Sequence, residues 1–240
     1  MALVAIVSLA QSSKEKADAL YENEEYQAAI TAYENILANE GVAPEVYYNL
    51  GNSYYNIDDI PHAILNYERA LKLDPGDNDI RANLALARGK TIDKVTPPSE
   101  MFFVTWWRNL TNVISVDAWS VWGIVSFVLM LAGVLVYMFV PALIFRKIGV
   151  YGAIALLVVC LIANLAALTQ RISNNEESAA IVIESAVVVK SSPSETSTDL
   201  FLIHEGTKVE ILDSSMKQWM EVKFEEGKQG WVPVGAVEVI

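Results

Sequence analysis

The stretch VYYNLGNSYYNIDDIPHAILNYERALKLDP, which runs from Val46 to Pro75, decides how the N-terminal part of the chain folds. Ala29 and Tyr33 recur 34 residues later as Ala63 and Tyr67. A fixed period of about 34 residues is typical of stacked repeats in which each unit is a pair of helices. The sequence therefore predicts two copies of one helical hairpin.

The second copy, over residues 44–77, resembles a tetratricopeptide repeat. The matching residues are Tyr47, Leu50, Gly51, Tyr54, Ala63, Tyr67, Ala70 and Pro75. Small side chains stand where two helices would cross closely, and aromatic rings fill the space between neighbouring helices. The first copy matches at fewer positions, namely Ala17, Leu20, Ala29 and Tyr33. The resemblance implies an all-α solenoid over residues 11–90, closed by a polar capping helix over residues 79–89.

Repeats of this family bind extended peptides on the concave face that the first helix of each unit forms. The positions that match this face are Lys14, Tyr21, Tyr48, Asn52 and Tyr55. In relatives that clamp a terminal carboxylate, a lysine and several asparagines hold the charged group, and Lys14 and Asn52 fit that pattern. Asp18, Ala82 and Leu86 depart from it, so the clamp is incomplete. The face suits a protein ligand, and a solvated surface that binds nothing is the alternative.

Two long apolar runs occupy the middle of the chain, from Trp119 to Phe139 and from Ile148 to Leu168, and neither contains a charge. Each has about 21 residues, enough for a helix to cross a hydrocarbon core of about 30 Å. A pair of buried core helices is the alternative, but such helices normally show one polar face. We therefore expect a transmembrane hairpin over residues 118–170. Residues 91–117 would form a linker and an amphipathic segment at the membrane surface.

Arg146 and Lys147 are the only charged residues between the two apolar runs, and they indicate the orientation of the hairpin. Short loops that are rich in Lys and Arg remain on the cytoplasmic side of a membrane. We therefore expect a short cytoplasmic loop around these two residues, with the N-terminal and C-terminal domains outside. Residues 1–10 resemble part of a secretory signal peptide without its positive start, which favours the same orientation. An apolar N-terminal helix is the alternative.

The C-terminal segment consists of short β-branched runs that alternate with turns. This pattern predicts about five antiparallel strands in a small all-β barrel. Residues 178–240 resemble a bacterial SH3 domain, and the segment lacks the tyrosines that bind proline-rich peptides in eukaryotic relatives. The matching segments are 186–194, 204–209 and 230–233. Trp219 and Trp231 are candidates for a ligand-binding face of this domain, with packing in the core or at its rim as the alternative.

Charge and composition argue against several classes of function. The net charge is −12, and residues 1–100, 101–175 and 176–240 carry −8, +3 and −7. Neither acidic part offers the basic surface that nucleic acid requires, so no nucleic-acid partner is expected. The single cysteine, Cys160, cannot form an intramolecular disulfide. The sequence contains no catalytic set, phosphate loop or metal-ligand motif, so we expect neither an enzyme nor a cofactor.

The order of the modules resembles that of a membrane-protein family encoded in bacterial aerotolerance (Bat) operons. The resemblance implies an inner-membrane protein of a Gram-negative envelope, with von Willebrand A-type Bat proteins among its partners. We expect a membrane-anchored scaffold that binds envelope proteins through its repeats and its SH3 domain. The alternative is a cell-wall sensor whose SH3 domain binds peptidoglycan.

Overall fold

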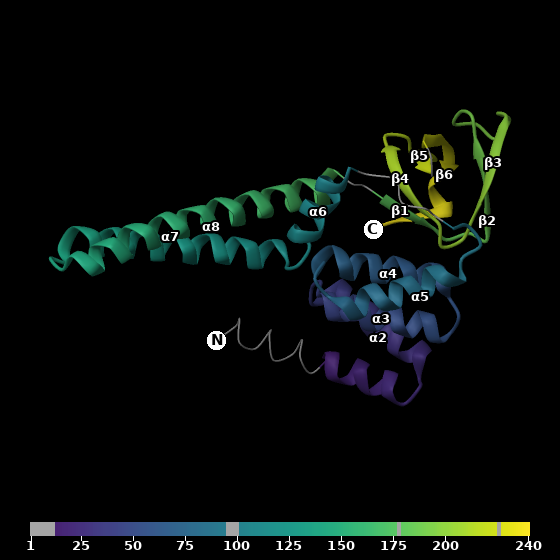
Figure 1. The fold of residues 1–240 in the computed structure, drawn as a ribbon. Coiled ribbons are helices and arrows are strands. Elements are labelled where there is room, and N and C mark those ends of the chain that lie inside the picture. Colours follow the sequence, from purple (N-terminus) through teal and green to yellow (C-terminus); the bar gives the residue numbers. More distant parts are fainter. Residues whose placement is uncertain (1–12, 95–100, 177–178, 225–226) are drawn as a thin grey trace. The chain divides into compact units, whose positions relative to one another are not determined.

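The computed structural model describes residues 13–94, 101–176, 179–224 and 227–240 (Figure 1). The chain divides into two compact units. The first contains the N-terminal helices and the C-terminal β domain, and the second contains the three helices that lie between them in the sequence. This confirms the predicted multidomain architecture of helical repeats, two long apolar helices and an all-β domain.

The described part of the first unit begins with a run of antiparallel helices. They span residues 13–22, α2 (Tyr26–Asn39), α3 (Pro44–Asn56), α4 (Ile60–Leu73) and α5 (Asn78–Lys90). Pro44 and Pro61 lie in the first turns of α3 and α4, where a helix needs no backbone donor. The side chains of Asp59 and Asp77 accept hydrogen bonds from the first backbone N–H groups of α4 and α5. These caps start each helix where the sequence signals it.

The turn within each helical hairpin repeats with the same period as the helices. Glu24 and Asp58 stand 34 residues apart in the sequence. Both adopt a left-handed backbone conformation, with φ of 63° and 64°. Such a conformation is uncommon for residues other than glycine. Its recurrence at equivalent positions shows that the two hairpins are copies of one unit.

The C-terminal domain is a single antiparallel sheet. Its described strands are β1 (Ala179–Val182), β2 (Ala186–Lys190), β3 (Asp199–His204), β4 (Lys208–Asp213), β5 (Trp219–Phe224), β6 (Lys228–Pro233) and β7 (Val237–Val239), in the order β3-β2-β6-β5-β4-β1-β7. The expectation of about five strands was wrong, because the structure describes seven. The edge strand β3 exposes Leu200 and Leu202, and β7 has only three residues, so neither strand shows a clear alternating pattern.

The β domain shares an apolar core with the second repeat. Ile181 of β1 is fully buried in a cluster that includes residues of α4 and α5, and Ile183 and Ile240 pack against the same cluster. A solenoid of only two repeats leaves an apolar end that further repeats would normally cover. Here the β domain covers it. The predicted polar capping helix, α5, therefore does not close the solenoid alone, since Ile80 and Leu84 of α5 are buried as well.

Charged contacts join the same two parts of the first unit. The side chain of Glu68 on α4 is 7% exposed and pairs with Lys208 of β4, at 2.9 Å, and with Arg88 of α5. Asp93, just after α5, accepts hydrogen bonds from the backbone N–H of His204 at 2.7 Å and from the hydroxyl of Thr207 at 2.9 Å. Repeats and β domain are thus held together by contacts distant in the sequence.

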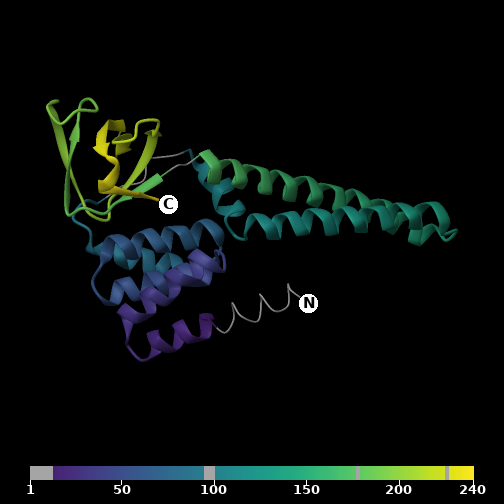
Figure 2. The same ribbon diagram turned by 180° about the vertical axis from the view of Figure 1, so that it is seen from behind.

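The second unit consists of α6 (Phe102–Thr111), α7 (Val116–Phe139) and α8 (Leu143–Glu176). Val116–Phe139 and Leu143–Ile172 are each long and apolar enough to cross a membrane. The two helices lie side by side and antiparallel (Figures 1 and 2). Gly133 of α7 contacts Gly149 of α8. The indole N–H of Trp119 donates to the carbonyl of Thr111 at 2.8 Å, which ties α6 to the start of α7.

The connection between the two long helices is shorter than the sequence suggested. Only residues 140–142 separate α7 from α8, so Arg146 and Lys147 lie at the start of α8 and not in a loop. Pro141 has no backbone N–H and cannot continue α7. The N–H of Arg146 donates to the carbonyl of Ala142 at 3.1 Å, so the next helix begins at once.

Candidate functional site

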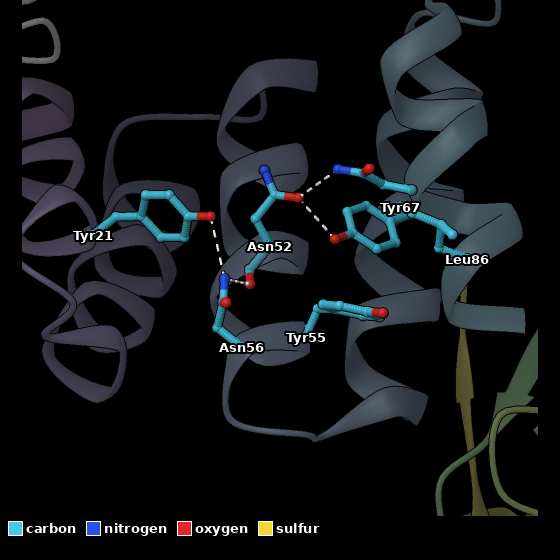
Figure 3. Close-up of a pocket in the computed structure, with 7 residues that line it drawn as sticks. Tyr21, Asn52, Tyr55, Asn56, Tyr67 and Leu86 are labelled. Atoms are coloured by element: carbon cyan, nitrogen blue, oxygen red, sulfur yellow. Dashed lines mark hydrogen bonds between the residues drawn. The ribbon is translucent and has the colours of Figure 1, made fainter. Parts of the chain in front are cut away.

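The helices of the repeats border an open cavity of about 210 Å³. Its lining residues are Tyr21, Asn52, Tyr55, Asn56, Tyr67, Asn83 and Leu86 (Figure 3). They come from residues 13–22 and from α3, α4 and α5. Because the helices stack side by side, polar side chains from separate segments meet at one place. We call this site the repeat groove.

Asn52 lies at the centre of the hydrogen bonds in the repeat groove (Figure 3). Its Oδ1 accepts from the hydroxyl of Tyr67 at 2.7 Å and from Nδ2 of Asn83 at 2.9 Å. Nδ2 of Asn83 also donates to the hydroxyl of Tyr48 at 2.9 Å. Burial raises the pKa of Tyr67 well above its usual value, so its hydroxyl keeps its proton and donates. The Asn52 and Asn83 amides are therefore held in fixed positions.

The remaining wall combines a second amide with apolar surface. Nδ2 of Asn56 donates to the hydroxyl of Tyr21 at 3.2 Å and to the backbone carbonyl of Asn52 at 2.9 Å. Leu86 of α5 is 61% exposed and contributes apolar surface to this wall. Exposed apolar surface beside fixed polar groups is typical of a binding site.

Two lysines on helices that contribute to the repeat groove are paired with carboxylates. Nζ of Lys90 lies 4.4 Å from the centre of the Tyr55 ring and 2.8 Å from Oδ1 of Asp58. Nζ of Lys14 lies 2.9 Å from Oδ2 of Asp18. Burial of Asp18 acts to raise its pKa, but hydrogen bonds from Tyr33 and Lys14 outweigh this and lower it. Each lysine therefore has its charge balanced by a carboxylate.

The structure brings most of the predicted binding residues together. Tyr21, Asn52 and Tyr55 line the cavity, and Tyr48 lies beside it through its hydrogen bond with Asn83. Lys14 is not among the lining residues and is held by Asp18. Lys14 and Asn52, which were predicted to hold one carboxylate, therefore do not both face the cavity. Whether these residues bind a partner stays a prediction.

Three lining residues were not predicted from the sequence, namely Asn56, Tyr67 and Asn83. Leu86 was placed on this face only as a departure from the clamp pattern. Asn56 follows Asn52 by one helical turn, and this spacing could have indicated it. Tyr67 was assigned to the core, where its ring is indeed buried while its hydroxyl reaches Asn52. Asn83 is not marked by the repeat period, because the positions one period after Tyr48 and Asn52 are Ala82 and Leu86.

A second candidate face lies on the β domain. Trp219 of β5 and Trp231 of β6 are half-buried, and they alternate with the buried residues Met220 and Val232. Because neighbouring side chains in a strand point to opposite faces, both tryptophans point away from the core. The strand register pairs Trp219 with Pro233, two residues beyond Trp231, so the two rings share one face. Neither ring belongs to the buried core cluster.

Comparison with known proteins identifies the repeats. A family model described as tetratricopeptide repeat matches residues 14–78, less than half of the chain. No curated protein matches the chain. Repeats of this family are typically non-catalytic modules for protein interaction. In the part of the chain that the structure describes, no group of three or more His, Cys, Asp or Glu side chains could hold a metal ion.

Proposed function

We propose that the chain is a membrane-anchored scaffold that binds partner proteins through the repeat groove. The observation that carries this function is the cavity of about 210 Å³, in which tyrosine rings, amides and an exposed leucine converge from separate helices. Such side chains give a protein ligand both apolar contact and hydrogen bonds. The two long apolar helices support attachment of the scaffold to a membrane.

The finer assignment follows the order of the modules. The chain is a BatE-type protein of the bacterial inner membrane, and its C-terminal β domain is a bacterial SH3 domain. Its partners are other envelope proteins, such as the von Willebrand A-type Bat proteins of an aerotolerance-related complex. The repeats and the β domain lie in the periplasm. The short connection beside Arg146 and Lys147 lies in the cytoplasm, which the positive-inside rule supports even though both charges stand on α8.

Reporter fusions test this orientation. A fusion after Gly89 or after Ile240 should be active only with a reporter that works outside the cytoplasm. A fusion at Lys147 should be active only with a cytoplasmic reporter. Cytoplasmic activity of the fusion at Ile240 would end the proposed orientation.

Co-purification from native membranes tests binding through the repeat groove. Leu86→Glu places a charge in the cavity without disturbing the core, because Leu86 is exposed, and it should remove most of the recovered partner. Ala85→Glu is the matched control, because Ala85 is exposed on the same helix and does not line the cavity. Both variants should melt like the wild type. Full recovery of the same partner with Leu86→Glu would show that binding uses another surface.

A cell-wall sensor is the second candidate function. It is favoured by the position of Trp219 and Trp231 on the outer face of the sheet, where their rings are open to a ligand. Trp231→Ala should reduce sedimentation of the protein with purified peptidoglycan, whereas loss of the half-buried ring should lower the stability of the domain by only about 1–2 kcal/mol and leave it folded. Leu212→Ala is the control, since Leu212 is 43% exposed on β4 of the same domain. Failure of the wild type to sediment with peptidoglycan would dismiss this candidate.

A further inference from the structure

We infer that α6 is a third membrane contact of the chain, in which its exposed aromatic rings enter the lipid leaflet beside the hairpin of α7 and α8. This inference rests on the part of the proposed function that attaches the chain to a membrane. It assigns a partner, the glycerol and upper acyl region of the lipid, to an apolar surface that the repeat groove does not use.

The exposed side of α6 is aromatic. Phe102, Phe103 and Trp106 each have more than half of their surface exposed. A helix turns by about 100° per residue, so these three rings lie within an arc of about 100° on one side of α6. Single apolar residues are normal on a protein surface, but several large aromatic rings gathered on one side of a helix indicate an interaction surface.

The other side of α6 is polar. It carries Thr105, Arg108 and Asn109, of which Arg108 and Asn109 are exposed. None of the ten residues of α6 is acidic. A helix with aromatic residues on one side and basic or uncharged polar residues on the other is typical of segments that lie in the plane of a membrane surface. Tryptophan is also enriched at this level of the bilayer.

α6 lies at the level where both spans leave the hydrocarbon core. Only residues 112–115 separate it from α7, which is the first span. The second span ends at Ile172. In the last turn of this span, Nε2 of Gln170 donates to the carbonyl of Ile114 at 3.3 Å, so the end of α8 meets the turn between α6 and α7. Figure 1 shows α6 at this end of the hairpin, and lipid that surrounds both spans therefore borders α6 as well.

Hydrogen bonds from both spans hold α6 in place. The indole N–H of Trp119 on α7 donates to the carbonyl of Thr111, the last residue of α6. Nε2 of Gln170 on α8 also donates to Oδ1 of Asn112 at 3.4 Å. Thr111 and Gln170 are buried, so water does not compete for these contacts. Because α6 is already ordered, its rings enter lipid without a further loss of chain entropy, and removal of their surface from water is favourable.

A partner protein is the alternative occupant of the aromatic side. Lipid is favoured because α7 exposes Val121 and Trp122, each 58% exposed, within two turns of its start. The apolar surface of the first span therefore begins directly after α6 in the chain. An aromatic helix side at the end of such a surface meets the same lipid that the span meets.

Fluorescence in lipid nanodiscs tests the inference. Cys160→Ala removes the only cysteine of the chain, and a single cysteine then replaces Phe103 or, as the matched control, Asn109. Both positions are exposed, but Asn109 lies on the polar side of α6. The full chain is labelled with an environment-sensitive dye and placed in nanodiscs of phosphatidylcholine.

The dye at position 103 should be quenched by nitroxide groups attached just below the lipid headgroup, and the dye at position 109 should be quenched by iodide in the water. This difference should persist at high salt, because the aromatic side carries no charge. Equal quenching by iodide at both positions would overturn the inference. Loss of the difference at high salt would overturn it as well.

Photo-cross-linking in native membranes separates lipid from protein as the partner of α6. A photoreactive amino acid at position 103 should form adducts with phospholipid, and one at position 109 should form far fewer. A cross-link from position 103 to one defined protein would overturn the assignment of lipid and leave the proposed function standing. Extraction of the wild-type chain from membranes at alkaline pH would instead count against membrane attachment, which belongs to the proposed function itself.

Discussion

At the residue scale, the contact between Gly51 and Tyr67 determines how closely α3 and α4 approach. A Cβ atom on Gly51 would lie 2.7 Å from two ring carbons of Tyr67, whose side chain is 1% exposed and has little room to move. Gly51→Ala should therefore lower the stability of the repeats by about 1–3 kcal/mol. Gly89→Ala, which meets nothing within 4 Å in α5, should instead be neutral or stabilising by up to about 1 kcal/mol. Hydrogen exchange of α3, α4 and α5 measures both effects, and equal losses of stability in the two variants would contradict the account.

His62 gives the repeats a pH-dependent contact at the start of α4. Its Nδ1 lies 2.8 Å from Oδ1 of Asp59, and its ring stacks on Tyr54 with centroids 5.0 Å apart. The hydrogen bond with Asp59 raises the pKa of His62, although burial acts in the opposite direction. A raised pKa in the folded state means that the stabilisation is complete below about pH 6.5. It is lost as the pH rises through the folded-state pKa.

We therefore expect His62→Gln to destabilise α4 at about pH 6 by a few tenths to about 1 kcal/mol, and by less at about pH 8. Hydrogen exchange of α4 in the wild type and the variant, compared at the same pH, measures the difference. Intrinsic exchange rates then cancel. A difference that stayed constant or grew with pH would show that the pair of His62 and Asp59 does not contribute in this way.

The residues of the repeat groove show which side chains and contacts can be predicted from the sequence. Tyr21, Asn52 and Tyr55 could be predicted, because the repeat period fixes which positions face the groove. The pairing of Lys14 with Asp18 could also have been foreseen from their spacing of one helical turn. The contribution of Tyr67 could not, because a ring buried in the core and a hydroxyl that reaches Asn52 belong to the same side chain.

At the scale of elements, the two long helices depend on a close glycine contact. A Cβ atom on Gly149 would lie 2.7 Å from the backbone oxygen of Gly133, which a rigid helix cannot withdraw. Gly149→Ala should push α8 away from α7 and destabilise the pair by about 1–3 kcal/mol. Gly152→Ala is the control, because a Cβ there meets nothing within 4 Å. Titration with a denaturing detergent, with helix content as the measured quantity, should show that Gly149→Ala unfolds earlier than Gly152→Ala. Identical unfolding curves for the two variants would contradict the close contact.

Element prediction succeeded where a periodic pattern was long. The 34-residue period located the helices of the repeats, and the apolar runs located α7 and α8. It failed where one local residue decides the outcome. Pro141 shortens the connection to residues 140–142, and this moved Arg146 and Lys147 from an expected loop onto α8. Composition alone does not show on which side of a proline the next helix resumes.

At the scale of the whole molecule, the repeats and the β domain should respond together to changes in their shared core. Ile181 and Ile203 are both fully buried, but Ile181 lies in the cluster with α4 and α5, whereas Ile203 lies in the core of the β domain. Ile181→Val should lower hydrogen-exchange protection of α4 and α5 by about 0.5–1.5 kcal/mol. Ile203→Val should affect only the strands. If both variants lowered the protection of α4 and α5 equally, or if neither did, the shared core would be contradicted.

This association could not be predicted from the sequence. The order of helical repeats, long apolar helices and strands followed from local patterns. The contact of Glu68 with Lys208 joins residues 140 positions apart. No local pattern encodes such a pair, and Glu68 reads as an ordinary exposed residue of an amphipathic helix until the β domain buries it.

The central claim is that the repeat groove holds a partner protein at the membrane, and cross-linking in native membranes tests it most directly. A photoreactive amino acid at position 86 points into the cavity, and one at position 85 on the same helix does not line it. The account predicts that position 86 cross-links to one defined partner and that position 85 does not. Equal cross-linking from both positions, or none from position 86, would contradict the claim.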